Sequence, residues 1–92
     1  MNQNIEFLQI DEALLLQRIE QGGQTGAFLA GAFISTYRMK PLKQSLGIIA
    51  NLDGDGILLL HQIIHMRHVP NWSDGQLYEL EKQILKIQRG VA

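Results

Sequence analysis

Apolar residues in this chain recur at the three- and four-residue intervals of an α-helix, and after residue 11 they do not alternate with polar residues as in a half-buried strand. This pattern predicts an all-α fold. A length of 92 residues leaves room for one hydrophobic core, so residues 1–92 should form a single helical domain. Extended structure is compatible only with the segment 4–10, and residues 1–10 are expected to be extended or loosely held.

Glycine, proline and capping residues divide the chain into four to five helices. Asp11 and Ser73 stand where a side-chain oxygen can accept hydrogen bonds from the free N–H groups of a first helical turn, and Gly22-Gly23 can end a helix. Pro41 is expected to begin a short element, because proline is tolerated in a first turn. The predicted helices cover about residues 11–21, 25–38, a short stretch from 41, 53–69 and 73–91.

The segment 53–69 is expected to be the central helix of a compact bundle. Its apolar residues are Ile57, Leu59, Leu60, Ile63, Ile64 and Met66. On a 3.6-residue period they cover more than half of the helix circumference, which is typical of a buried helix. The remaining strip is polar and consists of His61, Gln62, His65 and His68, with Leu58 at its edge.

The last predicted helix carries a short heptad seam. Leu77, Leu80, Ile84, Ile87 and Val91 are spaced 3, 4, 3 and 4 residues apart. The seam spans only about two heptads, and a coiled coil requires at least three, so packing in the core is favoured over dimerisation. A homodimer through this helix stays open as an alternative.

The balance of charge excludes several classes of partner. Eight Lys and Arg against nine Asp and Glu give a net charge of −1, without the basic excess that direct nucleic-acid binding requires. The densest basic group, Arg38, Lys40 and Lys43, is better explained as a solvated turn than as a phosphate site. The absence of cysteine excludes disulfides, thiolate nucleophiles and Cys-based metal centres.

Neither a signal peptide nor a membrane-spanning segment is expected. The first residues lack the basic start and apolar core of a signal peptide, and the longest apolar stretch, 26–34, is about half of what a bilayer requires. We therefore expect a cytoplasmic protein that does not enter a membrane and holds no cofactor.

Residues 51–62 resemble the start of a calcium-binding EF-hand loop. Asn51, Asp53 and Asp55 supply oxygens at positions 1, 3 and 5, and Gly56 stands at position 6. Position 12 requires a bidentate Glu and holds Gln62 instead. With two carboxylates, strong calcium binding is not expected, and capping of the following helix by Asp53 or Asp55 is the simpler interpretation.

His61-Gln62-Ile63-Ile64-His65 resembles the His-Glu-x-x-His helix of zinc hydrolases. Gln62 replaces the glutamate that acts as general base, and a carboxamide cannot take a proton from zinc-bound water. His61, His65 and His68 could share an ion, but ligands spread over two turns converge poorly on a tetrahedral centre. A strip that faces solvent or a partner is favoured, and a metal-dependent enzyme or sensor built on these histidines is the alternative.

Motifs for nucleophilic catalysis and nucleotide binding are absent. None of Ser35, Ser45 and Ser73 stands in a Gly-x-Ser-x-Gly elbow, and Ser73 is better explained as a helix cap. The glycines between residues 22 and 26 are not followed by the Gly-Lys-Ser or Gly-Lys-Thr of a Walker loop. The chain is therefore not expected to be an enzyme.

Several short segments stand out in order along the chain: Gly23-Gln24-Thr25-Gly26, Phe28-Leu29-Ala30, the turn before Leu42, the pair Leu52-Asp53, and Pro70. Together they resemble a family of short bacterial proteins of unknown function, over about residues 12–88. The chain departs from the family pattern at Pro41-Leu42, Thr25 and Val69. The resemblance implies an all-helical fold and, more loosely, a gene carried by bacteria or their mobile elements. It implies no activity and no functional residue.

By elimination, the predicted role is that of a small helical module that binds or regulates another protein. The predicted contact surface combines the strip of His61, His65 and His68 with the loop Val69-Pro70-Asn71-Trp72. Trp72 is included because tryptophan is enriched at interface hot spots. A tryptophan folded back onto the core is the equal alternative.

Overall fold

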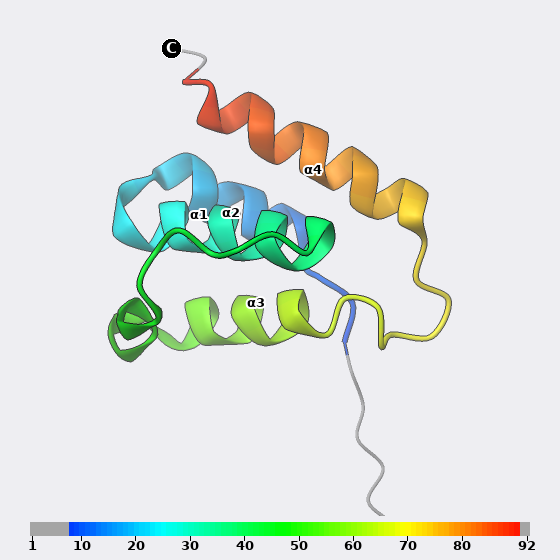
Figure 1. Ribbon diagram of the computed structural model, residues 1–92, viewed down its shortest axis with the longest axis horizontal. Helices are drawn as coiled ribbons and strands as arrows, with labels where there is room; N and C mark the ends of the chain where they lie inside the picture. Colours follow the sequence, from blue (N-terminus) through cyan, green and yellow to red (C-terminus); the bar gives the residue numbers. More distant parts are fainter. Residues whose placement is uncertain (1–7, 91–92) are drawn as a thin grey trace, which may run out of the picture.

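The computed structural model describes residues 8–90 (Figure 1). In these residues α1 (Glu12–Gln21), α2 (Gly23–Arg38), the 3₁₀ helix η1 (Leu46–Asn51), α3 (Gly54–Ile64) and α4 (Asp74–Gln88) follow one another. No strand occurs between residues 8 and 90, so the predicted all-α bundle is confirmed. Most of the segment expected to be extended or loose, residues 1–7, lies outside the described residues. Residues 8–10 form no regular element.

Three helices begin at capping residues that the sequence indicates. The side chains of Asp11, Asp53 and Ser73 each accept a hydrogen bond from the backbone N–H three residues later, at 3.2, 2.8 and 3.3 Å. Gly22 ends α1 with φ of 75° and ψ of −149°, a conformation that essentially only glycine adopts, and α2 follows at once. Local start and stop signals are therefore confirmed at these positions.

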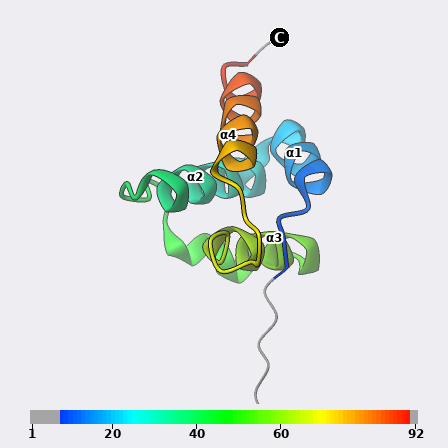
Figure 2. The same cartoon turned by 90° about the vertical axis from the view of Figure 1, so that its right-hand side faces the viewer.

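The centre of the bundle is α2, and the prediction that the segment 53–69 holds this place is wrong. Figures 1 and 2 show α3 on one side of the α1–α2 pair and α4 on the other, and α2 contacts every other helix of residues 8–90. Its small residues allow this enclosure, since a Cβ added to Gly26 would lie 2.8 Å from the backbone oxygen of Arg18 in α1. The buried residues of α2 are Gly26, Phe28, Leu29, Ala30, Ala32, Phe33 and Tyr37.

α3 is shorter and less buried than the sequence predicts. It ends at Ile64 rather than near residue 69, and the chain continues in turns as far as Asn71, whose φ is 63°. Only one side of α3 faces α2. Ile57 and Ile64, which were predicted to lie in the core, are 51% and 48% exposed.

The element after α2 also begins later than predicted. Pro41 starts no helix, and residues 40–45 run over the surface of the molecule without regular structure. The helix start lies at Ser45, whose hydroxyl oxygen accepts a hydrogen bond of 3.1 Å from the N–H of Gly47. A capping side chain therefore determines where η1 begins, rather than the proline ring.

The apolar seam of α4 packs inside the molecule. Leu77, Leu80 and Ile84 are buried, and Ile87 is half-buried against the same core, where α4 contacts α1 and α2. Val91 lies outside the described residues. The prediction that the seam packs in the core is confirmed. A homodimer through α4 would have to use other residues, because the seam as far as Ile87 is already covered.

Candidate functional site

Gln62, the residue at which both metal motifs fail, is buried and holds the start of α1. Its side chain is 4% exposed, and its Oε1 accepts a hydrogen bond of 2.8 Å from the backbone N–H of Asp11. Consecutive residues on a helix point about 100° apart, so His61 faces solvent while Gln62 faces the interior. The predicted grouping of Gln62 with the histidines in one polar strip is therefore wrong.

The carboxylates of the EF-hand-like segment are engaged within the fold. Asp53 caps α3 and forms an ion pair with Arg18 of α1, whose guanidinium also lies 3.7 Å from Asp55. The hydrogen bond from Arg18, together with that from the N–H of Gly56, lowers the pKa of Asp53. Because α3 already begins at Gly54, the residues that would have to wrap around a calcium ion are helical. The segment acts as a helix cap that is joined to α1.

His61, His65 and His68 lie next to one another at the surface. Their ring centroids are 4.7 Å apart between His61 and His65 and 5.2 Å apart between His65 and His68. The Nδ1 atoms of His65 and His68 are 3.3 Å apart. Partial burial lowers the pKa of His65, and charge on His61 and His68 lowers it further. The three predicted residues are thus brought together, although no three His, Asp or Glu side chains within residues 8–90 are placed to hold a metal ion.

Two of these histidines belong to a larger surface, which we name the α3 outer face. It consists of Ile57, Leu58, His61, Ile64 and His65, which share one side of the helix on a 3.6-residue period. Leu58 is 42% exposed, similar to the two isoleucines. None of the five residues is Lys, Arg, Asp or Glu, the residue types that usually occupy the solvent side of a helix. The sequence pattern indicated the histidines of this face but not its isoleucines.

Trp72, in the loop between α3 and α4, is 40% exposed. The guanidinium carbon of Arg67 lies 5.6 Å from the centroid of its ring, which is a cation–π contact. Trp72 also lines a small pocket together with Ile10 and Leu77. No residue of the α3 outer face lines this pocket. The prediction that Trp72 and the histidines form one contact surface stays a prediction.

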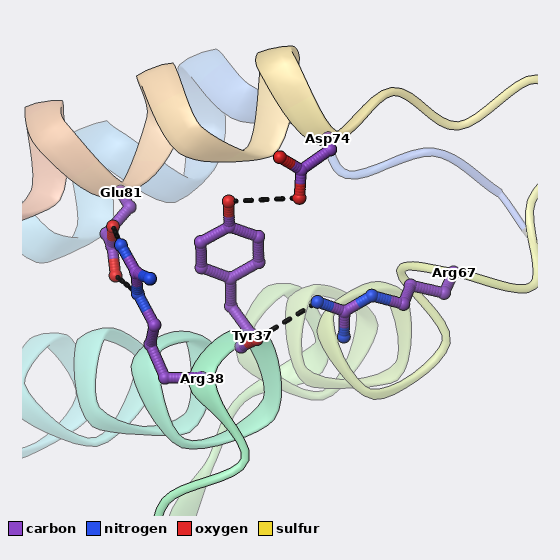
Figure 3. Close-up of polar contacts among 5 residues, drawn as sticks. All are labelled: Tyr37, Arg38, Arg67, Asp74 and Glu81. Atoms are coloured by element: carbon purple, nitrogen blue, oxygen red, sulfur yellow. Dashed lines mark hydrogen bonds and ion pairs between the residues drawn. The ribbon is translucent and has the colours of Figure 1, made fainter.

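A network of polar side chains joins α2 to α4 and to the turn after α3 (Figure 3). Glu81 of α4 is 4% exposed, and its two carboxylate oxygens accept hydrogen bonds of 2.7 and 2.6 Å from Arg38. The hydroxyl of Tyr37 donates to Asp74 at 3.2 Å, and Arg67 donates to the backbone oxygen of Tyr37 at 3.0 Å. Burial raises the pKa of Tyr37, and the hydrogen bond to Asp74 raises it further.

This network holds the helices together, and its partners are 30 to 43 residues apart in the chain. Arg67 neutralises the negative end of the α2 dipole by binding its last carbonyl groups. The ion pair with Glu81 raises the pKa of Arg38. Arg38, which the sequence analysis grouped with Lys40 and Lys43, is therefore engaged within the fold. The pairings were missed because no local pattern marks contacts between distant residues.

The serines do not form a catalytic pair with a histidine. The hydroxyl of Ser35 donates to the backbone oxygen of Lys40, whereas those of Ser45 and Ser73 accept hydrogen bonds from the backbone at the starts of η1 and α4. Each hydroxyl therefore has a local structural role.

Comparisons with known proteins add no relative. No family model, no curated protein and no solved structure matches the chain. The resemblance to the short bacterial family stays a prediction. Within residues 8–90, no helix has both the length and the apolar character that crossing a bilayer would need.

Proposed function

We propose that this protein is a non-enzymatic binding module that attaches to another protein through the α3 outer face. The observation that carries the proposal is the exposure of Ile57, Leu58 and Ile64, between 42% and 51%, on a helix side without fixed charge. A cluster of exposed aliphatic side chains is unfavourable in water and marks an interaction surface. The proposed location in the cytoplasm of a bacterium rests on the sequence alone.

The composition of this face indicates the chemistry of the partner. Interface centres are depleted of charged residues, and the spacing of Ile57, His61 and Ile64 is that of a helix lying in an apolar groove. Five side chains are far fewer than the roughly 20–30 residues per partner of a stable dimer interface. A groove that receives the outer side of α3 is therefore favoured over a second copy of the same face.

The metal-dependent alternative has less support. His61, His65 and His68 are neighbours, but a zinc site needs at least three converging ligands, and residues 8–90 contain no such group. Gln62, which would have to act as the base, faces the core. We therefore favour a place for His61 and His65 on a protein-binding surface over a role as metal ligands.

The test uses a matched pair of charged substitutions. I64E places a carboxylate on the α3 outer face, and Y78E places one on α4 at a residue of similar exposure, 45% against 48%. The immobilised wild type should capture a partner from an extract of the source cells that Y78E also captures and I64E does not. With the purified partner, calorimetry should show a loss of roughly 30-fold or more in affinity for I64E. The W72A variant measures the contribution of the loop.

Both variants should keep the melting temperature of the wild type, because they change exposed side chains. A partner that binds I64E as tightly as the wild type would show that the α3 outer face is not the docking surface. A concentration-dependent dimer in sedimentation that I64E abolishes would instead identify a second copy of the chain as the occupant and contradict the proposal of a different protein.

A further inference from the structure

A groove of about 470 Å³ lies between the second half of α2, the surface segment 40–44 and the end of α4. Its volume falls within the roughly 300–1,000 Å³ of small-molecule sites. Ile34 of α2 and Leu85 of α4 supply apolar surface, and Pro41 contributes from the segment 40–44. The groove shares no residue with the α3 outer face, so an inference about it is independent of the proposed docking surface.

The wall formed by residues 40–44 is tied to α2 at both ends. At one end the N–H of Lys40 donates to the backbone oxygen of Ser35 at 3.0 Å, and the hydroxyl of Ser35 donates to the oxygen of Lys40. At the other end Nε2 of Gln44 donates to the backbone oxygen of Ala27 at 3.3 Å. Leu42, between them, packs against the core. The groove is therefore built into the fold rather than left by a loose loop.

The charges that line the groove have one sign. Lys40 and Lys43 line it, and no Asp or Glu among the described residues does. Arg38, nearby in sequence, is neutralised by Glu81, whereas neither lysine forms an ion pair within residues 8–90. In a chain with a net charge of −1, this concave surface combines two ammonium groups with aliphatic side chains. That combination is complementary to a molecule with one anionic end and one apolar end.

We infer that this groove binds a small amphipathic anion, whose apolar body contacts Ile34 and Leu85 and whose anionic head is held by Lys40 and Lys43. The apolar contacts supply affinity, because they remove the ligand chain from water. The ammonium groups supply the preference for an anion over a neutral head.

The experiment titrates the ¹⁵N-labelled full chain with octanoate and follows amide chemical shifts. Octanoate should shift the amides around Gly31, Ser35, Lys43 and Leu85 and leave those of α3 unchanged. Octanol, with the same chain and no charge, should bind at least about fivefold more weakly, and acetate, with the same head and almost no apolar body, should cause no shift at these residues. Octyl phosphate, with the same apolar chain and another anionic head, should also bind more tightly than octanol; affinity no better than that of octanol would overturn the inference.

The double variant K40Q/K43Q should lose most of the preference for octanoate over octanol, whereas K82Q/K86Q, which removes two exposed lysines of α4 that do not line the groove, should keep it. Equal affinity of the wild type for octanoate and octanol would overturn the inference. So would shifts that fall outside the groove. The comparison of octanoate with octanol and the location of the shifted amides are both measured on the wild-type chain. These two measurements therefore do not depend on the folding of any variant.

Discussion

The backbone N–H of Asp11 donates a hydrogen bond to the side-chain oxygen of Gln62, across 51 residues of sequence. Asp11 caps α1 with its own carboxylate, so this contact fixes the start of α1 against α3. A glutamine meets the requirement without charge, and its burial at 4% exposure would be costly for an ionised group. Gln62, which replaces the glutamate required by both metal motifs, therefore serves to connect α1 to α3.

The variant Q62E supplies the residue that both motifs lack, and we expect it to bind neither calcium nor zinc at micromolar concentration in calorimetry. Burial should raise the pKa of the introduced carboxyl above its value in the unfolded chain. The variant should therefore be nearly as stable as the wild type below about pH 4 and should lose stability as the pH rises through the raised pKa, by roughly 1–3 kcal/mol at pH 7. Q83E, the same change at an exposed residue of α4, is the control. Stoichiometric zinc binding by Q62E would contradict the inward orientation.

The ion pair between Arg18 and Asp53 should make the free energy of unfolding depend on pH in the acid range. The pKa of Asp53 in the folded state lies below its unfolded value of about 4, so its stabilisation is fully present above that pH and is lost as the pH falls through the folded pKa. D53N should be less stable than the wild type at pH 7, and the two should converge toward pH 2. Urea denaturation at several pH values measures this, with R18Q as the reciprocal variant. A difference between wild type and D53N that is constant from pH 2 to 7 would refute the assignment.

Removing the guanidinium of Arg38 should leave the buried carboxylate of Glu81 without its ion-pair partner. We expect R38Q to lower the melting temperature by roughly 10 °C, because a buried charge without its partner is strongly unfavourable. The double variant R38Q/E81Q should regain part of this loss, since no buried charge remains. Calorimetric scans of both variants, with the exposed K82Q as control, provide the measurement. If the double variant were as unstable as R38Q, the pairing would not be the cause.

Substitutions at Gly22 and Gly54 measure the cost of backbone strain without a steric clash. A Cβ added at Gly22 or at Gly54 meets no atom within 4 Å, but only Gly22 has a positive φ, of 75°. G22A should therefore cost about 1–3 kcal/mol of stability, whereas G54A, in the first turn of α3, should be neutral or stabilise by up to about 1 kcal/mol. Chemical denaturation compares the two directly, and equal effects would show that the conformation of Gly22 is not limiting.

The sequence predicted those features of the fold that local chemistry determines. Asp11, Asp53 and Ser73 cap the helices that follow them because the side-chain oxygen and the N–H three residues later belong to one turn. The stop at Gly22 is equally local. The three histidines could be placed together because their spacing alone brings them to one side of the chain.

The arrangement of the helices and most of the candidate site could not be predicted in this way. Ile57 and Ile64 have the side chains of core residues, and only the position of α3 at the edge of the bundle exposes them. The helix with more small residues, α2, lies at the centre because these residues permit close approach. Glu81 and Gln62 are buried polar residues whose partners are 43 and 51 positions away, beyond any periodic pattern.

The enclosure of α2 has a consequence for which parts of this chain can change over evolution. Every added methylene on the buried residues of α2 must displace an atom of a neighbouring helix, so this segment should accept few substitutions. The α3 outer face and the segment 40–44 are instead exposed to solvent on one side. Variation can therefore concentrate on the surfaces that meet partners and ligands while α2 keeps the helices in place, and the binding properties of such a module can diverge without a change of fold.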